Sequence, residues 1–251
     1  MKKNLSGIIV FLCALMFFID FSLASDTVKV ITPSMGKEIP LENTAEAVQP
    51  IPDPIERFNR FFFKVNDKLY FWVLKPVAQG YGWVLPRSAR LSVQNFFWNV
   101  FSPVRMINCG LQGEFKEASV ELSRFGINTT IGVAGLFDPA KKCFHLEMKD
   151  EDFGQTIGCY KGPGFYLTLP FAGSTSLRDG IGSFVERCIV PSFYVLTHYS
   201  FPYVYGAEIL AAVNRTSLRI GEYEGLKRAA LDPYVSVRDA YNQHREDLIK
   251  R

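Results

Sequence analysis

The sequence predicts an all-α fold, and three observations support that prediction. Residue pairs that typically begin a helix occur at Asp53-Pro54, Ser102-Pro103 and Asp232-Pro233. Apolar side chains then recur every three or four residues, which places them on one face of a helix. Long alternation of apolar and polar residues, the pattern of a half-buried strand, is nearly absent. We therefore expect short helices joined by turns rich in proline and glycine.

The N-terminus has the features of a secretory signal peptide. Two lysines give it a positive start, residues 7–19 are apolar, and small residues precede a cleavage point after Ala24. Cys13 follows a bulky leucine and lies within the apolar stretch, so it does not fit the sequence box that precedes an acylated cysteine. We expect residues 1–24 to be removed on export and the mature chain to carry no lipid anchor.

The mature chain divides into a tether and a domain. Residues 25–52 hold four prolines and little periodic hydrophobicity, which is typical of an extended, flexible segment. No second change in composition follows, so residues 53–251 are expected to form one domain.

The first helix of this domain is predicted to begin at Asp53-Pro54 and to end before Pro76. The Asp53 carboxylate is suited to cap free N–H groups, and proline is favoured at the first helical position. Pro76 disfavours the α conformation for the residue before it. The apolar residues of this helix form a stripe at steps of three and four: Phe58, Phe62, Val65, Leu69 and Trp72.

Prolines and glycines also indicate where further helices begin and end. One is expected to begin at Ser102-Pro103 and to end at Gly110 or Gly113, and another to run from Glu114 to about Thr129. Asp232-Pro233 is expected to open a C-terminal helix. Residues 165–169 are predicted to form a short extended piece.

The stretch from residue 189 to residue 213 is apolar, but Pro191 and Pro202 interrupt it. A membrane-crossing helix needs about 20 uninterrupted apolar residues, so we expect two short helices with a turn near Pro202. The segment is crowded with aromatic residues, among them Phe193, Tyr194, Tyr199, Phe201 and Tyr203. Tyrosine is enriched at membrane interfaces, which favours a hairpin that contacts one leaflet or another membrane protein over an ordinary buried hairpin.

The sequence shows no catalytic or metal-binding constellation. The three histidines are scattered, and no nucleophile elbow or nucleotide-binding loop is present. Three successive carboxylates at residues 150–152 are more typical of a solvated loop than of acid–base catalysis. We expect no enzyme activity, no cofactor and no metal site. The mature net charge of +2 is too small for a nucleic-acid-binding face.

Four cysteines remain after export, and an oxidising compartment permits disulfides. Four cysteines allow three complete pairings that the sequence does not rank, so no bridge is predicted. The residues concerned are Cys109, Cys143, Cys159 and Cys188.

Several motifs together resemble the MlaA (VacJ) family of outer-membrane phospholipid-transport proteins. They lie, in the family's order, at residues 53–60, 74–78, 128–138, 150–158, 162–170, 176–179 and 232–238. Within them we expect structural roles, such as helix caps and ion pairs, for Asp53, Pro54, Phe58, Asn59, Arg60, Asp138, Phe153, Gly154, Arg178, Asp179, Asp232, Pro233 and Arg238.

The resemblance implies a ring of short, bent amphipathic helices embedded in the inner leaflet of the outer membrane. An amphipathic channel through the ring would remove misplaced phospholipids from the outer leaflet and pass them to a periplasmic carrier protein, which maintains lipid asymmetry. A porin would hold the ring in place. The family is typically lipidated, and this chain departs from it at Cys13.

The resemblance also gives the small and aromatic residues a role. We expect Gly126, Gly132, Gly135 and Phe137 to shape the wall of the channel, although each glycine singly fits ordinary bend chemistry. The aromatic residues between Phe193 and Tyr203 are the expected contact with the leaflet or a porin.

Two alternatives remain open. A structural or surface-spread envelope protein that docks on other outer-membrane proteins would share the export signal and the aromatic residues without a channel. A lipid-modifying enzyme would instead use Asp150, Glu151, Asp152 or His145.

Overall fold

The computed structural model describes residues 51–160, 164–189 and 202–250. These residues form helices and one two-stranded hairpin, which lies between two of the helices in the chain. The all-α prediction is confirmed. The helices are α3 (Glu56–Leu69), η1 (Tyr70–Leu74), α4 (Lys75–Val84), α5 (Arg87–Val100), α6 (Ser102–Leu111), α7 (Phe115–Thr130), α8 (Pro139–Phe144), α9 (Phe153–Tyr160), α10 (Leu177–Ile189), α12 (Pro202–Leu218), α13 (Glu222–Ala229) and α14 (Pro233–Lys250). The strands are β1 (Tyr166–Leu169) and β2 (Gly173–Ser176), which pair antiparallel.

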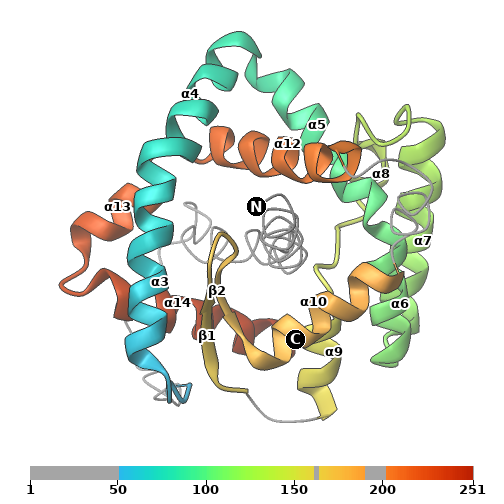
Figure 1. Ribbon diagram of the computed structural model, residues 1–251. Coiled ribbons are helices and arrows are strands. Elements are labelled where there is room, and N and C mark those ends of the chain that lie inside the picture. The colour runs from blue at the N-terminus through green and yellow to red at the C-terminus, as the bar shows by residue number, and fades with distance from the viewer. Residues whose placement is uncertain (1–50, 161–163, 190–201, 251) are drawn as a thin grey trace, which may run out of the picture.

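The helices are arranged around a ring, as Figure 1 shows. In that view α3 forms the left side, α4, α5 and α12 the top, α6 and α7 the right side, and α9, α10 and α14 the lower side. The β1–β2 hairpin stands between α3 and α10 and closes the lower left. Most helices lie in the plane of the picture, so the ring is built from helices that run around its axis.

Several of the predicted helix boundaries agree with the structure to within one or two residues. Helix α6 begins at Ser102, α7 ends at Thr130 and α14 begins at Pro233, and residues 166–169 are extended. Helix α12 begins at Pro202, where the second half of the aromatic hairpin was expected, while residues 190–201 lie outside the described residues.

The first helix does not end before Pro76, and the prediction is wrong there. The chain runs without a break through α3, η1 and α4, and Lys75 has α-helical dihedrals. The segment η1 is a π-helical turn in which the N–H of Lys75 donates to the carbonyl of Tyr70, five residues earlier. This wider turn accommodates Pro76, which has no N–H to donate.

Asp53 does not cap this helix, which also differs from the prediction. The residue at the N-cap is Ile55, and no side chain caps the helix start. The Asp53 carboxylate instead accepts hydrogen bonds from Asn59 and from the hydroxyl of Tyr234, 181 residues away.

Asn59 connects α3 to the hairpin. Its side chain is fully buried, and Nδ2 donates to Asp53 (2.7 Å) and to the carbonyl of Tyr166 (3.0 Å). Its Oδ1 accepts from the N–H of Thr168 at 2.8 Å. One amide thus satisfies a carbonyl and an N–H of strand β1.

Asn66 repeats this arrangement two helical turns further along the same face. Its Nδ2 donates to the carbonyl of Leu169 and its Oδ1 accepts from the N–H of Phe171, both at 2.8 Å. The two asparagines fix the register of α3 against the whole length of β1.

A small aromatic cluster lies beside this junction. Tyr166 packs its ring edge-on against Tyr234 and Tyr241, at centroid distances of 6.0 and 5.9 Å. Ile51, within the expected tether, is buried in the same cluster. The ordered domain therefore begins before Asp53.

The interior of the described chain is mostly polar. Of the buried side chains there, 24 are polar or charged and 12 are apolar or aromatic, which reverses the usual preference of globular proteins. Large apolar side chains lie on the surface instead, including Phe61, Trp72, Trp83 and Phe115, which are 60–90% exposed. Within the same residues, each helix is too short or too polar to cross a bilayer.

The hydrogen bonds of Asn59 lead to a prediction about stability. Asn59→Leu keeps the size of the side chain but leaves a buried carbonyl and a buried N–H of β1 without partners, at a cost of about 1–3 kcal/mol for each. Denaturant unfolding of the detergent-solubilised protein should show this loss, whereas Gln79→Leu, on the exposed face of α4, should change stability little. Equal effects of the two substitutions would contradict the role of Asn59.

Candidate functional site

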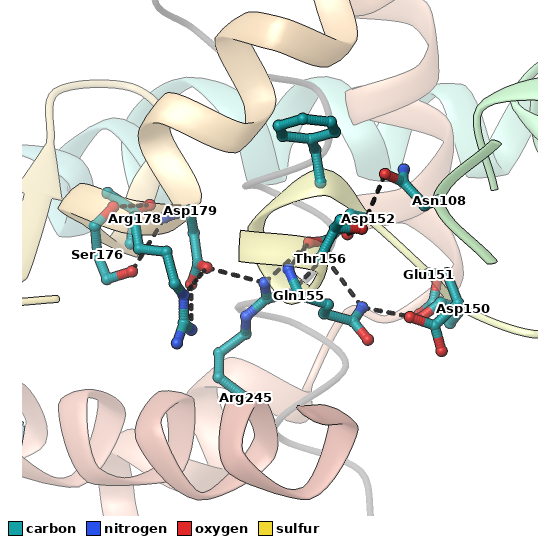
Figure 2. Close-up of polar contacts among 12 residues, drawn as sticks. Asn108, Asp150, Glu151, Asp152, Gln155, Thr156, Ser176, Arg178, Asp179 and Arg245 are labelled. Carbon is teal, nitrogen blue, oxygen red and sulfur yellow. Dashed lines mark hydrogen bonds and ion pairs between the residues drawn. The ribbon is translucent and has the colours of Figure 1, made fainter. Parts of the chain in front are cut away.

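A buried ionic cluster joins three helices on the lower side of the ring. Figure 2 shows Arg245 of α14 reaching between Asp152, which precedes α9, and Asp179 of α10. Its Nη2 lies 2.9 Å from an oxygen of each carboxylate, and its Nη1 forms a second contact with Asp152. Arg178 donates to Asp179 at 2.9 Å, and the hydroxyl of Tyr241 donates to the same carboxylate.

The charges in this cluster stabilise one another. Burial by itself is the largest influence and would raise the pKa of both carboxyl groups, but the positive charge of Arg245 and the other charges and hydrogen bonds around them together hold the pKa of Asp152 and of Asp179 below their usual value. Hydrogen bonds from Arg245 and Gln155 contribute for Asp152, and the charge of Arg178 contributes for Asp179. Both carboxylates are therefore ionised and structural, so residues 150–152 are not a solvated loop.

Glycines allow the helices to meet closely at this cluster. A Cβ atom on Gly182 would lie 2.4 Å from the backbone nitrogen of Gly154, and one on Gly154 would lie 2.5 Å from Asp179 Oδ1. Helices α9 and α10 therefore touch through their backbones, which brings Asp152 and Asp179 within reach of one arginine.

A second ionic cluster joins α6, α7 and the turn before α8. Arg105 Nε donates to Glu121 at 2.9 Å, and Arg124 Nη2 donates to Asp138 at 3.0 Å. Asn128 also donates to Asp138, at 3.0 Å. All of these side chains are buried or nearly so. Except for Glu121, they line a small polar depression together with Asn95, Trp98, Asn99 and Ser102.

The expected channel glycines differ in their surroundings. Gly135 has a φ of +89°, and a Cβ there would lie 2.3 Å from Cβ of Asn99. A Cβ on Gly132 would lie 2.4 Å from the carbonyl oxygen of Asn128. Gly126 has open space around its Cβ position. Gly132 and Gly135 therefore let the turn after α7 pack tightly, and of the three only Gly126 accepts a side chain without displacing the fold.

The turn formed by residues 131–137 presents apolar side chains outward. Val133 and Ala134 adopt left-handed dihedrals, at φ of 52° and 57°, which is unusual for residues other than glycine. Ile131, Val133 and Phe137 are more than half exposed. Phe137, an expected channel residue, thus lies on an exposed apolar turn.

Most of the family-motif residues meet at two places. Asp53, Asn59, Arg60, Asp232 and Arg238 surround Tyr234: the Arg60 guanidinium lies 4.5 Å above its ring and pairs with Asp232 at 2.8 Å. Asp232 also accepts from the N–H of Tyr234, so it caps α14, while Arg238 lies beside Asp53 and Asp239. Gly154, Arg178 and Asp179 belong to the cluster around Arg245, while the backbone N–H of Phe153 donates to Glu186 of α10. Pro54 and Phe58 are exposed, as is most of the first turn of α3.

Some expected residues lie outside the described part of the chain. These are Phe193, Tyr194, Tyr199 and Phe201, together with the side chain of Tyr203. The same holds for the signal peptide, for Cys13 and for the side chain of Cys188. Cys109, Cys143 and Cys159 are free thiols. Among the described residues, no cluster of three or more histidine, cysteine or acidic side chains is arranged to hold a metal ion.

The sequence analysis did not identify several of the buried charges. Arg245 follows Tyr234, Val237 and Tyr241 at helical spacing and is 2% exposed, but it was not predicted to be buried. Arg105, Glu121 and Arg124 were also missed. The i, i+3 spacing of Glu121 and Arg124 on α7 is a signal that could have found part of the second cluster.

Comparisons with known proteins agree with this architecture. A solved structure from work on the maintenance of bacterial outer-membrane lipid asymmetry superposes with a TM-score of 0.69 and 33% sequence identity, covering 78% of this chain and 98% of that chain. A family model described as MlaA lipoprotein matches residues 51–248. The chain belongs to the MlaA lipoprotein family.

Relatives in this family cover most of the chain. The Escherichia coli K12 protein named intermembrane phospholipid transport system lipoprotein MlaA is 36% identical over 202 residues, which is 78% of each chain. An uncharacterized protein of Rickettsia prowazekii is 34% identical over 203 residues, 79% of this chain and 78% of that protein. The resemblance stated from the sequence motifs is confirmed, and the characterised relatives are named as parts of a transport system rather than as enzymes.

The Arg245 cluster of this MlaA-family chain predicts how stability depends on pH. Because the folded-state pKa of Asp152 and Asp179 lies below the unfolded value, the contribution is complete above about pH 4 and is lost as the pH falls through the folded pKa. Asp152→Asn should lower the unfolding midpoint at neutral pH and reduce the further loss in acid. Urea unfolding measured between neutral and acidic pH tests this, with the exposed Asp247→Asn as control. Parallel pH profiles for all three proteins would contradict it.

The glycines of the 126–135 region predict opposite effects of one substitution. Gly135→Ala forces a side chain into a left-handed residue that touches Asn99, and it should destabilise the protein by about 1–3 kcal/mol. Gly126→Ala, in open space on α7, should leave stability unchanged or raise it by about 0.5–1 kcal/mol. Thermal unfolding of both variants and of the native chain tests these predictions. A Gly135→Ala variant as stable as the native chain would contradict the tight packing of this turn.

Proposed function

We propose that this chain is the outer-membrane component of an intermembrane phospholipid transport system. It would remove misplaced phospholipids from the outer leaflet and pass them toward the periplasm, which maintains lipid asymmetry. The observation that carries this proposal is the helical ring of a family whose characterised members are named for phospholipid transport.

The burial pattern supports a location within one leaflet. Large apolar side chains such as Trp83, Phe115 and Ile131 are exposed on the protein surface, where lipid tails would cover them. The helices run around the ring axis (Figure 1), so each one lies along the leaflet instead of crossing it. Buried polar groups pair with one another inside the protein, as a lipid environment requires.

The ring supports passage through its centre as the transport route. Gly126, Gly132, Gly135 and Phe137 are proposed to shape the wall of an amphipathic channel, with apolar side chains for the acyl tails and polar groups for the headgroup. The segment from Phe193 to Tyr203 is proposed to contact the leaflet or a porin. A periplasmic carrier protein is the proposed acceptor on the periplasmic face.

Transport by this chain needs no chemical step, and we propose that it is not an enzyme. The carboxylates of the rival enzyme interpretation have structural partners: Asp152 pairs with Arg245, and Glu151 accepts from Gln112 at 2.8 Å. A passive conduit fits this arrangement, because the charges are committed to holding helices together.

The test measures phospholipid exposed in the outer leaflet of the source cells. Deletion of the gene should raise the labelling of lipids by a membrane-impermeant amine reagent, and the intact gene should reverse the rise. No rise on deletion would contradict the transport function and favour a structural envelope protein that docks on other outer-membrane proteins.

A bulky residue in the proposed channel wall separates transport from folding. Gly126→Leu adds a side chain where a Cβ meets no atom within 4 Å, so the protein should fold and reach the membrane yet fail to restore asymmetry. Gly80→Leu, in equally open space on α4, is the matched control and should restore it. Full transport by Gly126→Leu would remove Gly126 from the channel wall.

A further inference from the structure

One exposed face of α3 and η1 carries three cations and two aromatic residues. Arg57, Phe61, Lys64, Lys68 and Trp72 follow one another at steps of four, three, four and four residues, and all five are exposed. This spacing keeps them along one line of the helix. We name these five residues the cationic stripe.

The three cations of the stripe are not compensated by nearby carboxylates. Other cations on the same continuous helix are paired: Arg60 with Glu56 and Asp232, and Lys75 with Glu224. Within the described part of the chain, Arg57, Lys64 and Lys68 form no ion pair. Lys68 Nζ instead lies 5.9 Å from the centre of the Trp72 ring, close enough for a weak cation–π contact.

Because the three cations follow one line of α3, the orientation of that helix decides how they lie relative to the ring. Helix α3 is seen along its full length on the left of Figure 1, so it lies in the plane of the ring and not along its axis. From Arg57 to Trp72 the stripe extends about 22 Å, at roughly 1.5 Å for each residue. If the ring lies flat in a leaflet, all three cations meet the same layer of that leaflet.

We propose that the cationic stripe binds the phosphate groups of anionic phospholipids at the surface of the leaflet that holds the ring. This inference rests on the proposed membrane location and adds a lipid class to it. An in-plane helix with cations and aromatic residues on its exposed face is suited to the headgroup layer. Lysine is depleted from protein–protein interfaces, which favours a lipid surface over an acidic protein as the partner.

The stripe is separate from the face of α3 that holds the ring closed. Asn59 and Asn66 point to the hairpin, while Lys64 and Lys68 are exposed. Neutralising the cations therefore removes charge without removing a described hydrogen bond of the fold.

The test compares the binding of the full mature chain to phosphatidylcholine vesicles with and without phosphatidylglycerol. The stripe variant combines Arg57→Gln, Lys64→Gln and Lys68→Gln. A cation near an anionic surface is worth about a fivefold change in affinity, so the variant should lose roughly 100-fold on anionic vesicles. Binding to neutral vesicles should not change, and added salt should remove the difference between the proteins.

A matched variant controls for net charge. Arg87→Gln, Lys116→Gln and Lys142→Gln remove three exposed cations from other helices, none of which has an ion-pair partner in the described chain. This control should keep most of its preference for anionic vesicles. Equal losses in the two variants, or undiminished binding by the stripe variant, would overturn the proposal. Inorganic phosphate added as competitor at constant ionic strength should displace neither protein from the vesicles, since the stripe is expected to respond to a charged surface and not to a free ion.

The two proposals fail in different ways. If the intact gene restores outer-leaflet asymmetry while the stripe variant binds anionic vesicles like the native chain, only the inference about the stripe is wrong. If the stripe variant fails to restore asymmetry in cells but binds anionic vesicles as the native chain does, the lipid surface is likewise rejected as the partner of the stripe, and an acidic protein is indicated instead. If the intact gene does not restore asymmetry, the transport function itself is refuted.

Discussion

The hydrogen bonds of Asn59 close the ring, and the rest of the structure depends on that closure. Asn59 joins α3 to strand β1 across 107 residues of sequence, and Asn66 extends the junction along the strand. A ring with apolar side chains on its outside gains less from an apolar core than a water-soluble domain does. Its shape must therefore be specified by polar contacts, which are directional and costly to leave unmade.

The buried ionic clusters apply the same principle at other points of the ring. Arg245 satisfies Asp152 and Asp179 at once, so α9, α10 and α14 are held in one relative position. Arg105 and Arg124 similarly lie against Glu121 and Asp138. Removing one partner of such a buried pair typically costs about 3–5 kcal/mol, because the remaining charge is left without its partner in a largely buried site. These clusters make the wall of the ring rigid where the apolar interior is small.

Local signals in the sequence predicted the helices well, because the signals act within a few residues. Helices α6, α12 and α14 all have a proline at their first or second position, as the sequence indicated. The partner of Asp53 was beyond such reasoning, since Tyr234 lies 181 residues away. A carboxylate near the start of a helix is expected to cap its free N–H groups, but in the folded chain a donor from a distant part of the sequence can bind it instead.

Periodicity also does not tell which side of a helix is inside. The apolar stripe through Phe58 and Trp72 predicted a helix but not its orientation: Phe58 is 47% exposed and Trp72 is 75% exposed, whereas Asn59 is fully buried. The same ambiguity hid Arg245, which continues the buried face of α14. In this chain large apolar side chains lie on the surface and many polar ones in the interior, so hydrophobicity alone does not mark the core, and only the partners of the polar residues do.

The π-helical turn η1 shows how one continuous helix serves two junctions. Five turns of an α-helix contain 18 residues, so a straight helix would bring the residue 18 positions after Asn59 back to the buried face. The buried residue on α4 is instead Ala78, 19 positions after Asn59 and fully buried. The extra residue taken up by η1 restores the phase, so that the face that binds the hairpin through α3 also packs against α12 through α4. Pro76 has no N–H to donate, which favours this wider turn. The proline that was expected to end the helix therefore helps to keep the hairpin contact of α3 and the α12 contact of α4 on the same side of one continuous helix.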